Sequence, residues 1–124
     1  MSTITGTTGA VAESYVRAWL SGDVDKAMSF VATDVVCDAP TGRIKGADAY
    51  RRFLEPFVGN LSNGQLDDLL TRDDRAVTVY SVDMPYLAGQ RGVEYLTVTD
   101  DKISKVLSIF DLAPALKARG EAAS

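Results

Sequence analysis

The chain has 124 residues, of which 46% are hydrophobic and 24% are charged, and these values are typical of one globular domain over residues 1–124. The formal net charge of −4 argues against a nucleic-acid partner, because binding phosphates requires a positive face, and no apolar stretch approaches the roughly 18 residues of a membrane-spanning helix. The sequence contains no histidine, which excludes the commonest general base and the usual nitrogen ligand of zinc.

At the N-terminus, residues 1–8 are expected to be disordered, because they are rich in Ser, Thr and Gly and lack the features of a signal peptide. Apolar residues at helical spacing then predict an amphipathic helix over residues 9–21, with a stripe of Val11, Tyr15, Ala18 and Trp19. Asp23 is a good N-cap for a second helix. The expected apolar stripe of that helix is Val24, Ala27, Met28 and Val31.

A short β-branched run predicts a strand over residues 34–39, which ends in a turn at 40–42. A third helix is expected over residues 46–58, with Gly59 as its C-cap. The apolar side of this helix is Ala47, Tyr50, Leu54 and Phe57. A last short helix is expected over residues 112–119, capped by Asp111.

Between the third helix and this tail, the period of apolar residues changes to two. This alternation predicts four strands, over residues 65–71, 75–84, 92–99 and 102–110. Helices followed by antiparallel strands predict an α+β fold, in which the helices cover one face of a curved sheet. A sheet of this kind encloses a cone-shaped cavity, which is a common place for a small apolar ligand.

Three segments of the sequence resemble the nuclear transport factor 2-like superfamily. They are AESYVRAWLSGDVDKAMSFVATDVV, PTGRIKGADAYRRFLEPF and VEYLTVTDDKISKVLSIFD, and they are most similar to the SnoaL-like polyketide cyclase and ketosteroid isomerase branch. The resemblance implies a cone-shaped antiparallel sheet around three helices, a site that needs no cofactor or metal, and a homodimer formed through the sheet. It indicates the reaction poorly, because isomerases, cyclases, dehydratases, epoxide hydrolases and plain binding domains share this fold.

Glu94 carries the clearest physical signal of a catalytic residue. It alternates with Leu96 and Val98, so it shares their apolar face, where lost hydration should raise its pKa. In the resemblance it matches the protonated acid with which ketosteroid isomerases stabilise an oxyanion beside a tyrosine, and Tyr15 matches that tyrosine. The alternatives are a glutamate in water or paired with Arg91, and a core tyrosine bonded to a backbone carbonyl.

Asp38, in the stretch VVCDAPTG, is the candidate base. Counting along the resemblance without gaps places the isomerase base on Ala39, so Asp38 would face the other side of the strand unless a bulge intervenes. The alternative is a solvent-facing aspartate before a turn. The base of the polyketide cyclases falls on Ser108, which cannot take the role, and Asp83 is a reserve candidate.

Aromatic and apolar side chains are expected to line the cavity as substrate-binding residues, or to be plain core. Those proposed for binding are Trp19, Phe53, Phe57, Asp83, Met84 and Phe110. The leading hypothesis is a cofactor-free enzyme in which carboxylate and tyrosine side chains move a proton on a hydrophobic ketone or polycyclic intermediate. A non-catalytic domain that binds a small hydrophobic molecule is the alternative, and epoxide hydrolysis is a weaker one. The single cysteine, Cys37, favours a reducing cytoplasm.

Overall fold

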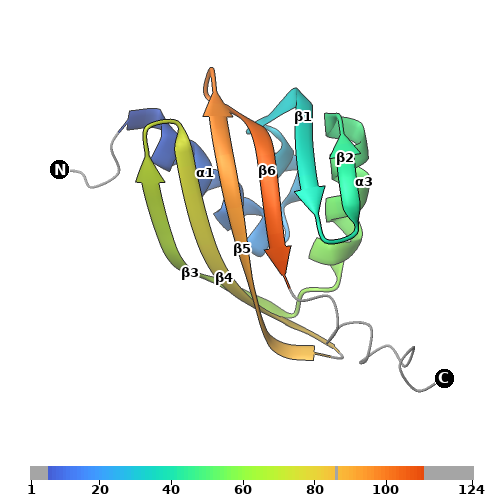
Figure 1. Ribbon diagram of the computed structural model, residues 1–124. Helices are drawn as coiled ribbons and strands as arrows, with labels where there is room; N and C mark the ends of the chain where they lie inside the picture. The colour runs from blue at the N-terminus through green and yellow to red at the C-terminus, as the bar shows by residue number, and fades with distance from the viewer. Residues whose placement is uncertain (1–5, 86, 111–124) are drawn as a thin grey trace.

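The computed structural model describes residues 6–85 and 87–110, which form three helices and six strands. The helices are α1 (Gly6–Leu20), α2 (Val24–Met28) and α3 (Ala47–Gly59). The strands are β1 (Val31–Ala39), β2 (Gly42–Lys45), β3 (Asn63–Arg72), β4 (Arg75–Met84), β5 (Leu87–Thr99) and β6 (Lys102–Phe110). All six strands belong to one sheet, and the helices lie against one of its faces (Figure 1).

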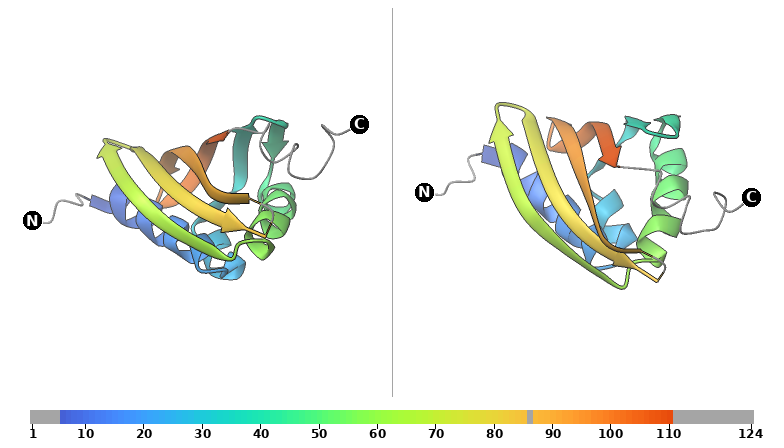
Figure 2. Two further views of the ribbon diagram at one scale, coloured as in Figure 1. Left: turned by 90° about the horizontal axis from the view of Figure 1, so that it is seen from below. Right: turned by 60° about the horizontal axis from the view of Figure 1, so that its bottom comes forward.

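The strand order across the sheet is β2-β1-β6-β5-β4-β3. Neighbouring strands are antiparallel except β1 and β6, which run parallel. Strands β2 and β3 are the two edges of the sheet, and the chain crosses from one to the other through α3. In Figure 2 the long strands β3, β4 and β5 curve over α1 and bend toward α3. This arrangement confirms the predicted α+β fold with a curved sheet around three helices.

The core lies between the helices and the concave face of the sheet. Side chains alternate along β4 and β5, so one set on each strand is buried against the helices. The buried set comprises Ala76, Thr78, Tyr80 and Val82 on β4, and Gly92, Glu94, Leu96 and Val98 on β5. Opposite them, α1 buries Tyr15, Val16 and Trp19, and α3 buries Tyr50, Leu54 and Val58. The face predicted for Glu94 from its alternation with Leu96 and Val98 is therefore the buried one.

Several strands differ from the sequence prediction. Strand β5 begins at Leu87, five residues before the expected start at 92, and β3 extends beyond the expected 65–71 at both ends. Strand β1 begins at Val31, which was expected on the apolar stripe of the second helix, whereas α2 has only five residues and is followed by its C-cap at Ser29. Val31 is buried because it pairs with Ile103 on β6. Strand β2 was not predicted, because its four residues Gly-Arg-Ile-Lys are too few and too polar to show an alternation.

The ends of the chain were also predicted only in part. Residues 6–8 are helical and belong to α1, although disorder was expected for residues 1–8. Residues 1–5, Asp111 and the helix expected over 112–119 lie outside the described residues. In the part that the structure describes, no helix is long and apolar enough to cross a membrane.

Candidate functional site

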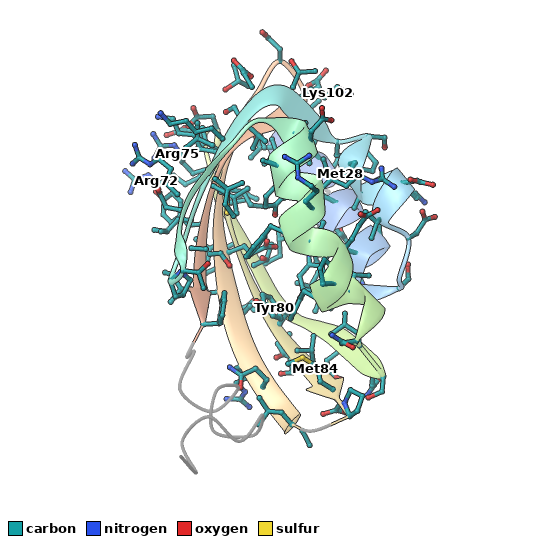
Figure 3. The ribbon with its side chains drawn as sticks, turned by 90° about the vertical axis from the view of Figure 1, so that its right-hand side faces the viewer. Met28, Arg72, Arg75, Tyr80, Met84 and Lys102 are labelled. Atoms are coloured by element: carbon teal, nitrogen blue, oxygen red, sulfur yellow. The ribbon has the colours of Figure 1, made fainter. Side chains whose placement is uncertain are left out.

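A partly enclosed cavity of about 110 Å³ lies between the concave face of the sheet and the helices. Six of the nine side chains that line it are aromatic. The lining residues are Trp19, Tyr50, Phe53, Leu54, Phe57, Tyr80, Glu94, Ser108 and Phe110. Figure 3 shows the Tyr80 side chain in this interior, between the sheet and α3. The volume is well below the roughly 300–1,000 Å³ of pockets for drug-sized ligands, so the cavity is suited to a compact group.

Glu94 is the one acidic side chain among the described residues that line this cavity, and it is only 4% exposed. Its Oε1 accepts a hydrogen bond from Trp19 Nε1 over 3.3 Å, and its Oε2 accepts one from the Tyr15 hydroxyl over 3.3 Å. Burial raises the pKa of Glu94 from 4.5 to about 7, although both hydrogen bonds favour the ionised form. The carboxyl group therefore exchanges its proton near neutral pH.

No cation compensates the charge of Glu94 in the described part of the chain. The ion pairs found there all lie elsewhere, and none of the cavity-lining residues is basic. Arg91, the partner considered from the sequence, is exposed on the same strand, three residues from Glu94. An odd number of residues along a strand separates opposite faces, so Arg91 points away from the cavity.

Hydrogen bonds through Tyr15 on α1 and Tyr50 on α3 link these two helices to Glu94. The hydroxyl groups of Tyr15 and Tyr50 are hydrogen-bonded to each other, and both side chains are buried. Burial is the main cause that raises the pKa of each phenol well above 10, and the charge of Glu94 adds to it, so both remain neutral. A phenol has one proton, so when Tyr15 donates to Glu94 the proton between the two phenols comes from Tyr50.

Tyr15 and Tyr50 differ in how they reach the cavity. Tyr15 is not among the lining residues and approaches the cavity only through Glu94 and Tyr50, whereas Tyr50 lines it directly. The sequence pattern indicated only that Tyr50 lies on the apolar side of the third helix, and this role was not predicted. The available signal was its residue type, since a tyrosine on a buried stripe requires a partner for its hydroxyl.

Two small hydroxyl residues flank Glu94 on the neighbouring strands. Thr78 on β4 and Ser108 on β6 are its partners in the sheet register, and both are buried. Ser108 lines the cavity. The Thr78 hydroxyl is buried and has no hydrogen-bond partner within the described residues. These side chains surround the acid with neutral polar groups rather than charges.

Aromatic contacts fix the walls of the cavity. The Trp19 ring meets Tyr80 edge-on, with centroids 4.9 Å apart, and lies tilted against Phe57 at 5.5 Å. On α3, Tyr50 stacks on Phe53 at 6.1 Å. Such offset and edge-to-face pairs stabilise the fold beyond the free energy gained by burying the rings, and they restrict the motion of the rings. The chain therefore holds an aromatic enclosure with Glu94 in its wall.

Gly92 is required for the position of Tyr80. The two residues are partners in the register between β4 and β5, and the Tyr80 phenol lies across the Gly92 backbone. A Cβ atom at position 92 would overlap the Tyr80 hydroxyl oxygen, far inside van der Waals contact. The missing side chain of Gly92 thus makes room for one wall of the cavity.

Asp38 does not lie at the cavity, contrary to its expected role as the base. Strand β1 pairs regularly with β2 from Val36 to Ala39, so no bulge turns the carboxylate inward. Asp38 is instead a cross-strand partner of Arg43, whose Nε donates to Oδ1 over 2.8 Å, and this ion pair is exposed. The hydrogen bond from Arg43 lowers the pKa of Asp38. Ala39 packs against the core, as the gap-free count implied.

Asp83 and Met84, which were also proposed for the site, are absent from the cavity lining. Asp83 alternates with the buried Val82, and its Oδ1 accepts a hydrogen bond from the backbone N–H of Gly89 over 2.7 Å. It therefore fixes the turn between β4 and β5. Met84 is partly buried and packs against the core. Of the residues proposed for the site, the structure brings together five in the cavity lining, namely Trp19, Phe53, Phe57, Glu94 and Phe110.

A second, larger groove of about 370 Å³ lies on the outer face of the sheet. It is open to solvent and is lined by Val36, Asp38, Arg43, Arg75, Tyr95, Thr97, Lys105, Val106 and Leu107. Figure 3 shows Arg75 projecting from the side of the sheet that faces away from the helices. The charged groups of this groove are exposed, and its one acid, Asp38, is paired with Arg43, which lowers its pKa, so the smaller inner cavity with its buried acid is the better candidate site. Among the described residues, no group of three or more potential ligands could hold a metal ion.

Comparison with known proteins agrees with this fold. The family model described as SnoaL-like domain matches residues 12–106. A solved structure of a protein from Kribbella flavida is 37% identical, with a TM-score of 0.87, over 92% of this chain and 94% of that chain. Among curated proteins, none matches the sequence.

Two further solved structures show the same fold at low identity. A proposed ketosteroid isomerase from Kribbella flavida is 23% identical, with a TM-score of 0.73, over 85% of this chain and 78% of that chain. TerC, which was co-crystallised with polyporic acid, is 18% identical, with a TM-score of 0.74, over 91% of this chain and 98% of that chain. At this level of identity the similarity demonstrates a shared fold and leaves the reaction open.

Proposed function

The chain belongs to the SnoaL-like domain family, and from this premise we propose that its inner cavity binds a compact hydrophobic ketone and that Glu94 moves a proton on it without a cofactor. One observation carries the proposal: a buried acid lines an aromatic cavity and has no cation beside it. Two proteins of the same fold support a small-molecule substrate, namely TerC, which was co-crystallised with polyporic acid, and the proposed ketosteroid isomerase from Kribbella flavida.

Glu94 is suited to general acid–base catalysis. Its pKa of about 7 means that both the acid and the carboxylate are present near neutral pH, which is the condition under which proton transfer is most efficient. With Asp38 and Asp83 away from the cavity, Glu94 takes the role of the base. The ionised carboxylate removes a proton from the carbon next to the carbonyl and returns it to another carbon of the same ligand.

The Tyr50 hydroxyl is proposed to stabilise the oxygen on which negative charge develops. During the proton transfer the electron pair of the broken C–H bond moves toward the carbonyl oxygen, so a donor aimed at that oxygen lowers the barrier. Tyr50 lines the cavity. Before the transfer Tyr15 donates to Glu94; once Glu94 has taken up the proton, Tyr15 donates to Tyr50 instead, which frees the single Tyr50 proton for the ligand oxygen. Tyr15 is then a positioning residue that orients both Tyr50 and Glu94.

The volume of the cavity supports a small substrate. About 110 Å³ accommodates a single ring more readily than a polycyclic skeleton, which would require a pocket several times larger. Phe53, Phe57 and Phe110 supply the apolar walls against which such a ring packs.

A non-catalytic binding domain is the second candidate function. It is favoured by Ala39 and Ser108, which occupy the two positions where the resemblance places a catalytic base, because neither side chain accepts a proton usefully. In this case the same aromatic cavity retains a neutral ligand and releases it unchanged.

A single-ring ketone with an isolated double bond separates the two candidates. We expect the protein to convert cyclohex-3-en-1-one into its conjugated isomer, which absorbs more strongly in the ultraviolet, with a rate that rises with pH through about 7. Glu94→Gln should lower the turnover roughly 10²–10⁴-fold. Asp38→Asn, which also removes one negative charge but lies outside the cavity, is the matched control and should react like the unchanged protein. If Glu94→Gln turns over the ketone as fast as the unchanged protein does, Glu94 is excluded as the base. If the unchanged protein binds the ketone without converting it, the non-catalytic binding domain is favoured.

We also propose that two copies associate through the outer face of the sheet and that the protein is cytoplasmic. Four large apolar side chains are exposed there or nearby, namely Leu70, Tyr95, Leu107 and Ile109. Apolar side chains in such a group favour burial against a partner. A cytoplasmic location is supported by the single cysteine, Cys37, which is buried and unpaired.

A further inference from the structure

The inner cavity combines two features that attract the same kind of ligand. Its walls carry six aromatic rings, and Glu94 is the one ionisable acid among the described residues that line it. The face of an aromatic ring is negative because of its quadrupole, and a carboxylate is negative when ionised. Nothing positive in the described part of the chain balances them, since the ion pairs lie elsewhere and no lining residue is basic.

Several classes of ligand fit these features poorly. An anion would be repelled by Glu94. An inorganic cation would have to exchange its water shell for a single carboxylate, and no group of three potential metal ligands exists among the described residues. A neutral hydrocarbon would pack against the rings but would leave the buried charge uncompensated. An organic cation with methyl groups satisfies both the rings and the acid, because its charge is spread over an apolar surface that loses little hydration.

We propose that the inner cavity binds a small organic cation of the quaternary or tertiary ammonium class, with Glu94 as its counter-ion and the surrounding aromatic side chains as its enclosure. Trp19, Tyr80 and Phe57 form one part of this enclosure, since the Trp19 ring contacts each of the other two at a different inclination. Tyr50 and Phe53 form another part on α3. The volume of about 110 Å³ restricts the ligand to a head group the size of a trimethylammonium ion or a single small ring.

The groups that face Glu94 from neighbouring elements remain neutral near pH 7. Tyr15 from α1 and Tyr50 from α3 have pKa values raised well above 10 by burial. Burial raises the pKa of Cys37 on β1 to about 12 and raises that of Tyr80 on β4 above its usual value. Trp19, Thr78 and Ser108 do not titrate. Glu94 is therefore the group whose ionisation controls the charge at the cavity, and the cation should bind more tightly as the pH rises through about 7.

Choline and its neutral isostere 3,3-dimethylbutan-1-ol are the appropriate probes, because they have almost the same shape and differ in the charge of the head group. Trp19 is the only tryptophan of the chain and lines the cavity, so its fluorescence reports on both ligands. At pH 8 and constant ionic strength, we expect choline to bind at least tenfold more tightly than the isostere. At pH 5.5, where Glu94 is protonated, this preference should fall toward unity.

Variants test which groups carry the preference. Glu94→Gln should lower the preference for choline at pH 8 to the value that the unchanged protein shows at pH 5.5, whereas Asp38→Asn, which changes the net charge equally on the outer face, should retain the full preference. Phe57→Leu should weaken the binding of choline more than that of the isostere, because an aliphatic side chain has no quadrupole. The pH dependence of the unchanged protein keeps the test valid if a variant does not fold.

The proposal is overturned if choline and the isostere bind equally at pH 8, if neither binds, or if the preference is independent of pH. The inference does not depend on the proton transfer proposed above, because choline carries no ketone to react. A protein that binds choline but leaves cyclohex-3-en-1-one unchanged supports this inference alone. A protein that isomerises the ketone but ignores choline supports the proton transfer alone.

Discussion

The indole of Trp19 donates from Nε1 to Oε1 of Glu94 over 3.3 Å, and this bond links the first helix to an acid on the fifth strand, 75 residues away in the sequence. The second oxygen of Glu94 accepts a bond of the same length from Tyr15. Both donors are neutral. The carboxylate is thus held in place without being neutralised by a cation, and its burial dominates its pKa.

The stability of the fold should depend on the protonation of Glu94. Because burial raises its pKa from 4.5 to about 7, the native protein keeps this proton between these two pH values while the unfolded chain has lost it. The contribution of Glu94 to the free energy of unfolding is therefore largest below pH 4.5 and decreases as the pH rises to about 7, by about 3 kcal/mol at most.

Urea unfolding of the unchanged protein and of Glu94→Gln at pH 5 and pH 7.5 measures this effect. The amide cannot ionise, so the variant should gain stability relative to the unchanged protein as the pH rises. Other carboxylates titrate in both proteins and cancel in the difference. A difference that stays constant between the two pH values would show that Glu94 ionises as readily in the fold as in water.

Tyr50→Phe should affect the reaction more than the fold. The substitution removes the hydroxyl that we propose as the donor to the ligand oxygen and keeps the ring that stacks on Phe53. We expect kcat for the ketone isomerisation to fall roughly 10²–10³-fold with little change in KM. Steady-state kinetics at pH 8 check this.

Tyr15→Phe is the informative companion of that variant. It removes one hydrogen bond that favours the ionised form of Glu94, so the midpoint of the pH–rate profile should move to higher pH. In Tyr50→Phe the bond between Tyr15 and Glu94 remains, and the midpoint should stay near 7. Identical profiles for the two variants would contradict the separate roles assigned to them.

Gly92→Ala should damage the wall of the cavity. The new methyl group would overlap the Tyr80 hydroxyl, and the buried ring would have to move, which typically costs about 1–3 kcal/mol of stability. We expect a lower midpoint of thermal unfolding and a changed near-ultraviolet signal from Trp19, which contacts Tyr80 edge-on. In the background of Tyr80→Leu the same substitution should cost much less. A full cost that persists in that background would mean that Tyr80 is not the obstacle.

Association through the outer face of the sheet predicts a dimer in solution. Leu107 is 43% exposed in the groove of that face, so Leu107→Asp should dissociate the dimer by burying an unpaired charge at the interface. Arg52→Glu on the exposed side of α3 is a control that should leave the dimer intact. Sedimentation velocity distinguishes the two states. A monomeric unchanged protein would refute the association.

The features that the sequence predicted well are those governed by side-chain periodicity. The alternation of Glu94 with Leu96 and Val98 correctly indicated their shared buried face, and the bounds predicted for β4 and β6 agree with the structure. The short gaps between the predicted strands are tight turns in the structure, and Asp73 and Asp100 adopt positive φ there, which aspartate tolerates better than most residues. In each case the signal lies within a few consecutive residues.

The features that the sequence left undetermined depend on contacts between distant segments. The direction of Asp38 follows from the regular pairing of β1 with the unpredicted strand β2, which also supplies its partner Arg43. The role of Tyr50 follows from the packing of α3 against α1, which brings its hydroxyl to Tyr15. The beginning of β1 at Val31 is set by pairing with β6, more than 70 residues later. None of these relationships leaves a local pattern in the chain.

Carbon-13 NMR of the side-chain carboxyl groups, followed from pH 4 to pH 9, measures the ionisation of Glu94 directly. The resonance that is absent from the Glu94→Gln variant identifies the residue. The buried, uncompensated acid described above should titrate with a midpoint near pH 7. A midpoint near 4.5, the ordinary value for glutamate, would mean that water or an unrecognised cation reaches the carboxylate, and both the proton transfer and the cation site would lose their basis.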